Sequence, residues 1–326
     1  MKMKFIVIPL VAAVLGAVGV AQWAGYPRAK VTAHVLGEDG NPVSSAKISF
    51  AFHSQFDAKI PAVVDGLTDG NGNFTAEGYT DGGFGSSIRK EGYYLGAPNI
   101  PPFYEEKDNR WLPWDATYTS VLRKIENPIP MYARHMATAI PAMKEACGYD
   151  LEEADWVAPW GKGKTPDFFI TVTNNQYRSN NDNEANVTIS FPNPDDGIQE
   201  TQLPKEFANS QFKWPRLAPE GGYQPKFEAH RLWVNIPRGQ KQDVNTANED
   251  QAYFFRVRSV RQGDKITSAL YGKIKGGIAV GPNEGKNGAI GFTYYLNPTP
   301  LDRNMEFDLK KDLFKNLSND DQPRDP

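Results

Sequence analysis

The sequence contains almost no cysteine. Cys147 is the only one among 326 residues. A single thiol cannot form an internal disulfide, which excludes the disulfide framework of small secreted animal domains and suits a bacterial exported protein better. Cys147 lies in Glu145-Ala146-Cys147-Gly148 without a neighbouring histidine, so we interpret it as a small buried residue and not as a nucleophile.

Histidine is also scarce, and familiar catalytic motifs are absent. The four histidines are His34, His53, His135 and His230, and no two of them stand at a metal-binding spacing. Neither H-E-x-x-H nor G-x-S-x-G occurs, which disfavours a zinc peptidase and an α/β-hydrolase. Carboxylates are plentiful, but a catalytic pair for glycoside hydrolysis is defined in space and not in sequence. The sequence therefore leans against an enzyme and leaves a carbohydrate-active enzyme as the alternative.

The chain has no block or stripe of positive charge. It carries 36 Lys and Arg residues against 39 Asp and Glu residues, for a formal net charge of −3. Binding of nucleic acid needs concentrated Lys and Arg side chains that meet the phosphates. The charge pattern therefore argues against a nucleic-acid partner.

The one long apolar run stands at the N-terminus. Lys2 and Lys4 precede an uncharged stretch from Phe5 to Ala21, which ends in the small-x-small sequence Gly19-Val20-Ala21. This pattern is typical of a cleaved signal peptide over residues 1–21, with an uncleaved N-terminal anchor as the alternative. Either interpretation predicts export to the periplasm or beyond the cell. Contact with the membrane is expected only through this segment, and only if it is not cleaved.

Turn residues and short alternating patterns are abundant in the rest of the chain. There are 29 Gly and 25 Pro residues, and apolar positions recur in short stretches. After a linker expected over residues 22–29, Val31, Ala33 and Val35 alternate with polar residues, as in a half-buried strand. Together with the chain length, these patterns predict a mainly β protein of two domains.

Five motifs in residues 30–124 are similar to the carboxypeptidase regulatory-like family. They are V-x-A-x-V, D-G-N-P-V, A-x-I-x-F, T-D-x-x-G-x-F and E-G-Y, which stand here at Val31–Val35, Asp39–Val43, Ala46–Phe50, Thr68–Phe74 and Glu91–Tyr93. The resemblance implies a transthyretin-like (Ig-like) β-sandwich that serves as an accessory, surface or adhesive module. The matching positions are turns and core, so they indicate a shape and no particular ligand. The aromatic and Pro-rich segment Tyr94–Trp114 departs from the family pattern as an insertion.

The second part of the chain shows strands of an unrecognised family. We expect a rigid, Pro-rich connector over residues 125–134, a second β-rich domain over 135–315 and a disordered polar tail over 316–326. The only helical candidate is Ala137–Cys147, and Pro141 weakens it. The clear strand patterns are Phe168–Thr173, Asn186–Phe191, Arg231–Ile236, Tyr253–Val260, Thr267–Val280 and Ala289–Leu296. They predict a second antiparallel β-sandwich or a jelly-roll-like domain.

Two pairs of tryptophans are the candidate ligand contacts. Trp111 and Trp114 form one pair, Trp156 and Trp160 the other, and each pair stands in a Pro-containing segment typical of loops. Exposed rings on sandwich loops stack on sugars or anchor a protein partner, so a cell-surface glycan or a protein is the expected partner. The more ordinary interpretation is that these rings cover the domain junction and the ends of the sandwiches.

Three polar segments resemble ligand loops in part. Ala158–Thr165 fits a relaxed phosphate-loop pattern, but Pro166 and a strand pattern follow where a helix is needed, so we expect a basic turn. Asp69–Asn73 carries oxygen ligands at alternate positions, as calcium loops do, and Asn180–Glu184 is a second oxygen-rich loop. The glycine and glutamate of the helix-loop-helix calcium motif are missing at the first of these, which favours a turn between strands. No cofactor is expected, and calcium is the ion that these loops leave open.

The leading hypothesis is a non-catalytic exported protein of the cell envelope with a binding or structural role. One alternative is a carbohydrate-active enzyme with paired carboxylates in the second domain. Another is a subunit of a surface assembly whose exposed strand edges pair between copies.

Overall fold

The computed structural model describes residues 26–53, 62–98, 103–236, 240–247, 251–282 and 286–326. The signal segment predicted over residues 1–21 lies outside these ranges. Within them the regular structure is strand throughout, apart from one 3-10 turn, η1 (Lys205–Phe207). No helix in this part of the chain is long and apolar enough to cross a membrane. The prediction of a mainly β protein is confirmed.

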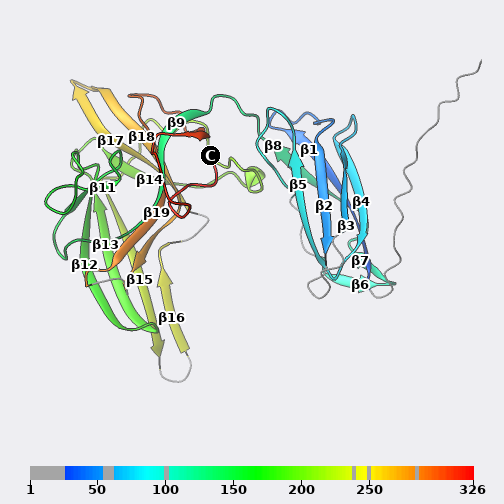
Figure 1. The fold of residues 1–326 in the computed structure, drawn as a ribbon, viewed down its shortest axis with the longest axis horizontal. Helices are drawn as coiled ribbons and strands as arrows, with labels where there is room; N and C mark the ends of the chain where they lie inside the picture. The colour runs from blue at the N-terminus through cyan, green and yellow to red at the C-terminus, as the bar shows by residue number, and fades with distance from the viewer. Residues whose placement is uncertain (1–25, 54–61, 99–102, 237–239, 248–250, 283–285) are drawn as a thin grey trace, which may run out of the picture.

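Strands β1 to β8 form an N-terminal domain of two facing sheets (Figure 1). Their bounds are β1 (Arg28–Gly37), β2 (Lys47–His53), β3 (Ala62–Leu67), β4 (Asn73–Tyr79), β5 (Gly83–Arg89), β6 (Glu105–Lys107), β7 (Arg110–Leu112) and β8 (Ala116–Leu122). In one sheet β1 pairs with β4 and β8, and the β6–β7 hairpin joins it at Arg28; the other sheet has the order β3-β2-β5. Successive side chains of a strand face opposite sides, so Val31, Ala33 and Val35 of β1 meet Ile48 and Phe50 of β2 in the core.

Strands β9 to β20 form the second domain, which is a sandwich of two six-stranded sheets. Their bounds are β9 (Ile129–Ala139), β10 (Cys147–Asp150), β11 (Asp155–Trp156), β12 (Phe168–Ser179), β13 (Asp182–Ser190), β14 (Gly197–Thr201), β15 (Lys226–Ile236), β16 (Gln240–Asn245), β17 (Ala252–Gln262), β18 (Lys265–Gly281), β19 (Ala289–Asn297) and β20 (Phe307–Asp312). One sheet has the order β11-β10-β12-β13-β15-β16 and the other β14-β17-β18-β19-β9-β20. The six strands predicted from alternation are β12, β13, β15, β17, β18 and β19.

The sheet that contains β17 and β18 is covered on both of its faces. Phe255 and Ile274 point into the sandwich core, whereas Phe254 and Tyr271 pack on the opposite face in a second cluster with Trp214. Six consecutive residues of β17 are therefore buried, without the alternation of a strand that has one wet face. The second cluster lies where the two domains meet.

The helical candidate Ala137–Cys147 is wrong. Residues up to Ala139 belong to β9, which pairs antiparallel with β19 from Tyr132 to Ala139, and Cys147 begins β10. Pairing with a neighbouring strand has prevailed over local helix propensity here. Cys147 is buried as expected, and burial raises the pKa of its thiol. The connector is also shorter than the predicted 125–134, because β9 already begins at Ile129 and pairs there with Phe307 of β20.

The tail over residues 316–326 is packed against the second domain, and the prediction of a disordered tail is wrong. The backbone N–H of His135 donates to the Asp321 carbonyl at 2.8 Å, and the hydroxyl of Tyr295 donates to the Asp325 carbonyl at 2.9 Å. Lys275 forms an ion pair with Asp325. The tail was predicted to be disordered because its composition is polar. Its polar groups bond to groups on β9, β18 and β19, and the tail sequence alone does not reveal these partners.

Candidate functional site at the domain junction

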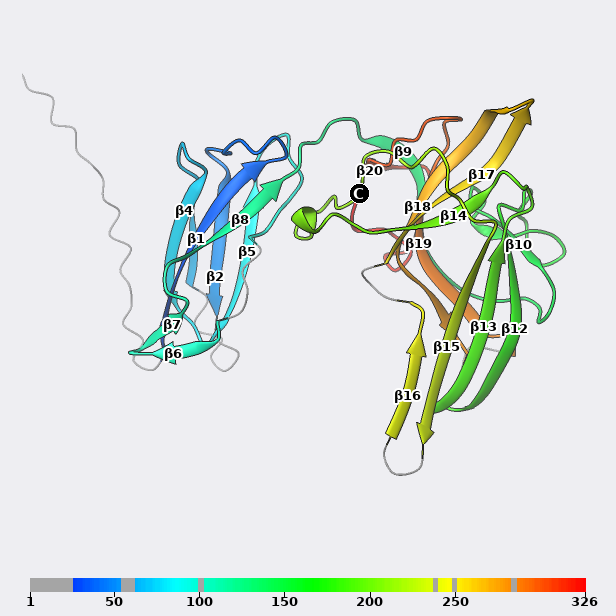
Figure 2. The same cartoon turned by 180° about the vertical axis from the view of Figure 1, so that it is seen from behind.

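A long connection between β14 and β15 bridges the two domains, and we call residues 202–218 the junction loop. The junction loop carries η1, which lies beside β8 of the N-terminal domain (Figure 2). Its backbone pairs with the segment that follows β5. Ala97 N–H donates to the Asn209 carbonyl at 3.1 Å, and Gln211 N–H donates to the Leu95 carbonyl at 2.8 Å. The second domain thus adds an extended segment next to a sheet of the first, as a bound peptide does in β-augmentation.

Gly96 allows this addition because it lies close to the core. Its N–H and carbonyl both bond to Ile88 of β5, at 3.0 and 2.7 Å, so residues 95–97 extend the β3-β2-β5 sheet. A Cβ at this position would stand 2.6 Å from Cδ2 of Leu122. A side chain at this position would have to displace the buried side chain of Leu122, so glycine favours the close approach at which the junction loop pairs.

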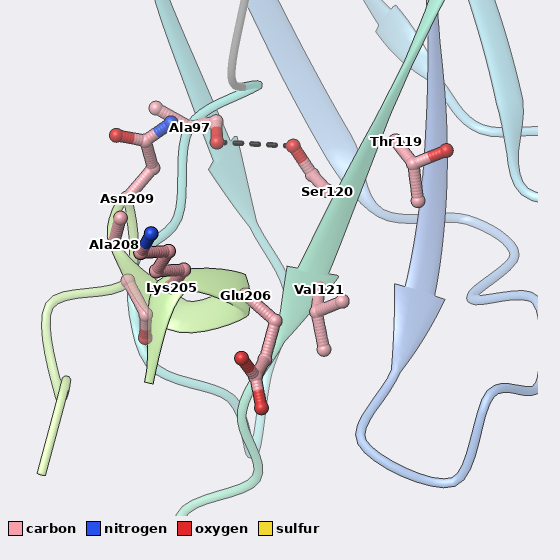
Figure 3. Close-up of a pocket in the computed structure, with 9 residues that line it drawn as sticks. Ala97, Thr119, Ser120, Val121, Lys205, Glu206, Ala208 and Asn209 are labelled. Carbon is pink, nitrogen blue, oxygen red and sulfur yellow. Dashed lines mark hydrogen bonds between the residues drawn. The ribbon is translucent and has the colours of Figure 1, made fainter. Parts of the chain in front are cut away.

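A half-open cavity of about 240 Å³ lies between η1 and β8 (Figure 3). The Ser120 hydroxyl donates to the Ala97 carbonyl at 3.0 Å on one wall. On another wall, the buried hydroxyl of Ser210 has no hydrogen-bond partner among the residues that the structure describes. The exposed side chains of Lys205 and Glu206 stand at the rim. These groups can bind and orient a small polar ligand through hydroxyl, amine and carboxylate contacts.

Arg123, at the end of β8, clamps the junction loop from the N-terminal domain. Its Nη1 donates to the carbonyls of Phe212, at 3.3 Å, and Trp214, while Nε donates to Glu38 at 2.9 Å. The guanidinium carbon lies 4.1 Å from the ring centre of Phe207 and 4.6 Å from that of Phe212. Only 4% of the Arg123 side chain is exposed, so these contacts act in a dry environment, where charge–dipole and cation–π interactions are strongest.

Glu306 collects donors from both domains and from the connector. This carboxylate is 1% exposed and accepts the Tyr94 hydroxyl at 2.8 Å and the backbone N–H groups of Glu126 and Asn127 at 2.9 Å each. Arg216 of the junction loop stands at an ion-pair distance of 3.3 Å from it and bonds to Glu38 at 2.6 Å. Burial and the charge of Glu306 raise the pKa of Tyr94 well above its ordinary value. Burial opposes ionisation of Glu38 too, but Arg123 and Arg216 hold its pKa below normal.

Lys273 of β18 is fully buried beneath the junction loop. Its Nζ donates to the Met305 carbonyl at 2.7 Å and lies 5.1, 5.2 and 4.6 Å from the ring centres of Phe212, Trp214 and Tyr295. Burial holds the pKa of this amine well below its ordinary value of 10.5. The rings attract the cation but do not replace the hydration that it has lost.

Replacing Lys273 with methionine should remove a pH dependence from folding. The folded-state pKa is depressed, so the unfolded chain binds more protons between that value and 10.5, and wild-type stability rises with pH in this window. In urea unfolding from about pH 6 to about pH 9, the wild type should therefore gain stability relative to Lys273→Met. Lys265→Met, on an exposed turn, is the matched control and should follow the wild type. Parallel profiles for wild type and Lys273→Met would show that the amine titrates normally.

The structure separates the two predicted tryptophan pairs and places neither at the junction. Trp111 lies on β7 at the end of the N-terminal domain remote from the second domain; it is half-buried, and its Nε1 donates to the Thr80 carbonyl at 2.8 Å (Figure 1). Trp114 is half-buried beneath Arg110. Trp156 is 6% exposed in the core of the second domain, and half-buried Trp160 packs against that core. The tryptophan at the junction is Trp214.

The three partial motifs are used as turns. In Ala158–Thr165 the backbone N–H groups that a phosphate would need are taken by carboxylates: Lys162 N–H donates to Asp155 and Lys164 N–H to Asp150, at 2.9 and 2.8 Å. Asp69 accepts the N–H groups of Asn71 and Asn73 in the turn before β4. Among the described residues, no group of three or more His, Cys, Asp or Glu side chains is placed to hold a metal ion.

No family model matches the sequence, and no curated protein matches it. Among solved structures, a streptococcal ancillary pilin shares 9% identity over 67% of this chain, with a TM-score of 0.20, and this chain spans 59% of its length. The shaft pilin SpaA from Lactobacillus rhamnosus GG shares 11% identity over 75% of this chain and 92% of its own, with a TM-score of 0.21. At this level of similarity neither neighbour indicates a function.

Proposed function

We propose that this chain is a non-catalytic exported protein of the cell envelope, in which two β domains work as one stiff structural and binding unit. The observation that carries the proposal is the junction loop, which pairs with residues 95–97 of the other domain through its backbone. Two buried charged residues stabilise this contact, Arg123 from the N-terminal domain and Glu306 from the second domain. Domains that move independently meet through smaller and wetter contacts.

The geometry suits a spacer or display role better than a catalytic one. Two buried charged groups at the junction are satisfied by their neighbours: Glu306 accepts three hydrogen bonds, and Arg123 donates to Glu38 and to two carbonyls. Such a network fixes the relative positions of the residues that it joins. The resemblance of residues 30–124 to carboxypeptidase regulatory-like modules supports the same role, since the family serves as accessory or adhesive domains. The apolar segment over residues 1–21 supports export.

The proposal is tested by the distance between the two domains in solution. Pulsed dipolar spectroscopy with one spin label in each domain should give a single narrow distribution for the wild type. A broad or multiple distribution would mean that the domains are joined by a hinge, and the proposed stiff unit would then be wrong.

A further inference from the structure

Two adjoining cavities form a groove along the junction, and we call it the junction groove. The larger, of about 660 Å³, lies over β9, β18 and β19 beneath the tail; the smaller, of about 470 Å³, reaches Ser86 and Ser87 of β5 in the N-terminal domain. Lys213, Arg324 and Asp325 line both cavities. The C-terminal end of the chain lies beside the junction in Figures 1 and 2. The groove is therefore continuous, and its two halves belong to different domains.

Lys213 reaches the groove because its neighbours face the other way. Phe212 and Trp214 are buried against Lys273, and in an extended segment the residue between two buried ones points to the opposite side. Arg324 is placed by the tail, because its neighbour Asp325 is fixed by Tyr295 and Lys275. Both cations therefore stand on anchored backbone.

The charges along the junction groove do not cancel. In the larger cavity three cationic side chains, Lys213, Lys275 and Arg324, face two acidic ones, Asp320 and Asp325. Lys275 is paired with Asp325. Within the described part of the chain, Lys213 and Arg324 have no ion-pair partner. Two cations at the shared centre of a groove attract an anionic ligand and can bond to its carboxylates.

The remaining lining includes glycines and many polar side chains. Gly276, in a left-handed conformation with φ of 72°, and Gly277 lie where the pairing of β18 with β19 is interrupted, which leaves a floor without side chains. The other polar side chains of the lining include those of Ser86, Ser87, Thr293, Asn209, Gln211 and Asn319. Hydroxyl and amide groups recognise sugar hydroxyls, and a glycine floor permits close approach.

We infer that the junction groove binds a segment of a carboxylated polysaccharide. Its hydroxyl and amide lining suits the hydroxyls of sugar units, and Lys213 and Arg324 suit their carboxylates. The inference rests on the proposed function, because only a fixed junction keeps the two halves of the groove aligned.

Titration with polygalacturonate oligosaccharides tests the inference. The wild type should bind them saturably and more weakly as salt rises, and Lys213→Glu and Arg324→Glu should each weaken binding by at least about tenfold. Lys265→Glu makes the same charge change on a remote exposed turn and should bind as the wild type does. Absence of saturable binding, or an equal loss in Lys265→Glu, would overturn the inference.

Two further measurements make the outcome specific. Neutral dextran and poly(glycerol phosphate) should bind more weakly than polygalacturonate, and tighter binding of either one would reject the carboxylated class. Interdomain distances measured on the same samples separate the two proposals. Failed binding with a narrow distance distribution rejects only the groove, whereas a broad distribution rejects the stiff unit on which it rests.

Discussion

Replacing Arg123 with methionine should destabilise the protein by about 3 kcal/mol and uncouple the two domains. The methionine fills much of the space between Phe207 and Phe212 but donates no hydrogen bond. The carbonyls of Phe212 and Trp214 lose the donor that follows β8, and Glu38 keeps Arg216 and the backbone N–H of Lys124 as its partners. In calorimetry, the wild type should unfold in one transition, and Arg123→Met should unfold in two.

Arg110→Met is the matched control for Arg123→Met. Arg110 belongs to the same domain and also lies over an aromatic ring, Trp114, at 4.9 Å, but it is exposed. Its replacement should cost less than about 1 kcal/mol, because exposed cation–π contacts are weak. If Arg123→Met costs no more than this control, Arg123 does not clamp the junction.

Replacing Arg258 with methionine should cost about 3–4 kcal/mol at neutral pH. Arg258 stands on β17 with a left-handed φ of 55° and is the cation to which three carboxylates bond. Asp167, which is fully buried, bonds to its Nε and Nη2 at 2.8 and 2.9 Å; Asp150 and Glu152 also bond to it. Without the guanidinium, Asp167 would remain as a buried, uncompensated charge.

The loss of unfolding free energy in Arg258→Met should become smaller as the pH falls toward about 5. Burial raises the pKa of Asp167 despite its bonds to Arg258, and loss of the arginine raises it further. A protonated carboxyl group is less costly to bury than a carboxylate. Lower pH therefore reduces the loss of stability in the variant. Lys164→Met, which removes an exposed ion pair with Glu153, is the control and should change stability by less than about 1 kcal/mol at either pH. A deficit that stays constant with pH would mean that the lost contacts are steric and not electrostatic.

The sequence predicted those strands whose two faces have different surroundings. β1 and β13 alternate between buried and less buried residues, and each was found from that alternation. β9 was missed because its partner lies far along the chain: β9 pairs with β19, about 150 residues away. β10 pairs with the nearby β11 and β12, but its four residues are all buried and show no alternation. A strand whose pairing is fixed by a distant neighbour has little local pattern of its own.

The junction was not predicted, although two signals point to it. Lys273 stands within the apolar stretch Ala269–Ile274, where a lysine has no solvent-facing position if both faces are covered. Phe212-Lys213-Trp214 has the alternation of a short strand inside a segment otherwise typical of a loop. The pairing of Arg123 with the carbonyls of Phe212 and Trp214 had no such signal, because it joins residues about 90 positions apart. The tryptophans chosen from the sequence were expected in loops, but Trp111 lies on β7 and Trp156 on β11, and all four rings are half-buried or buried.

The distance between the domains tests the central claim most directly. Spin labels at Lys107→Cys on β6 and Lys265→Cys on the β17–β18 turn occupy exposed positions on different domains. Cys147→Ala removes the one natural thiol. The labelled protein should give one narrow distance distribution, which Arg123→Met should broaden. A wild-type distribution as broad as that of Arg123→Met would contradict the account of two domains held as one unit.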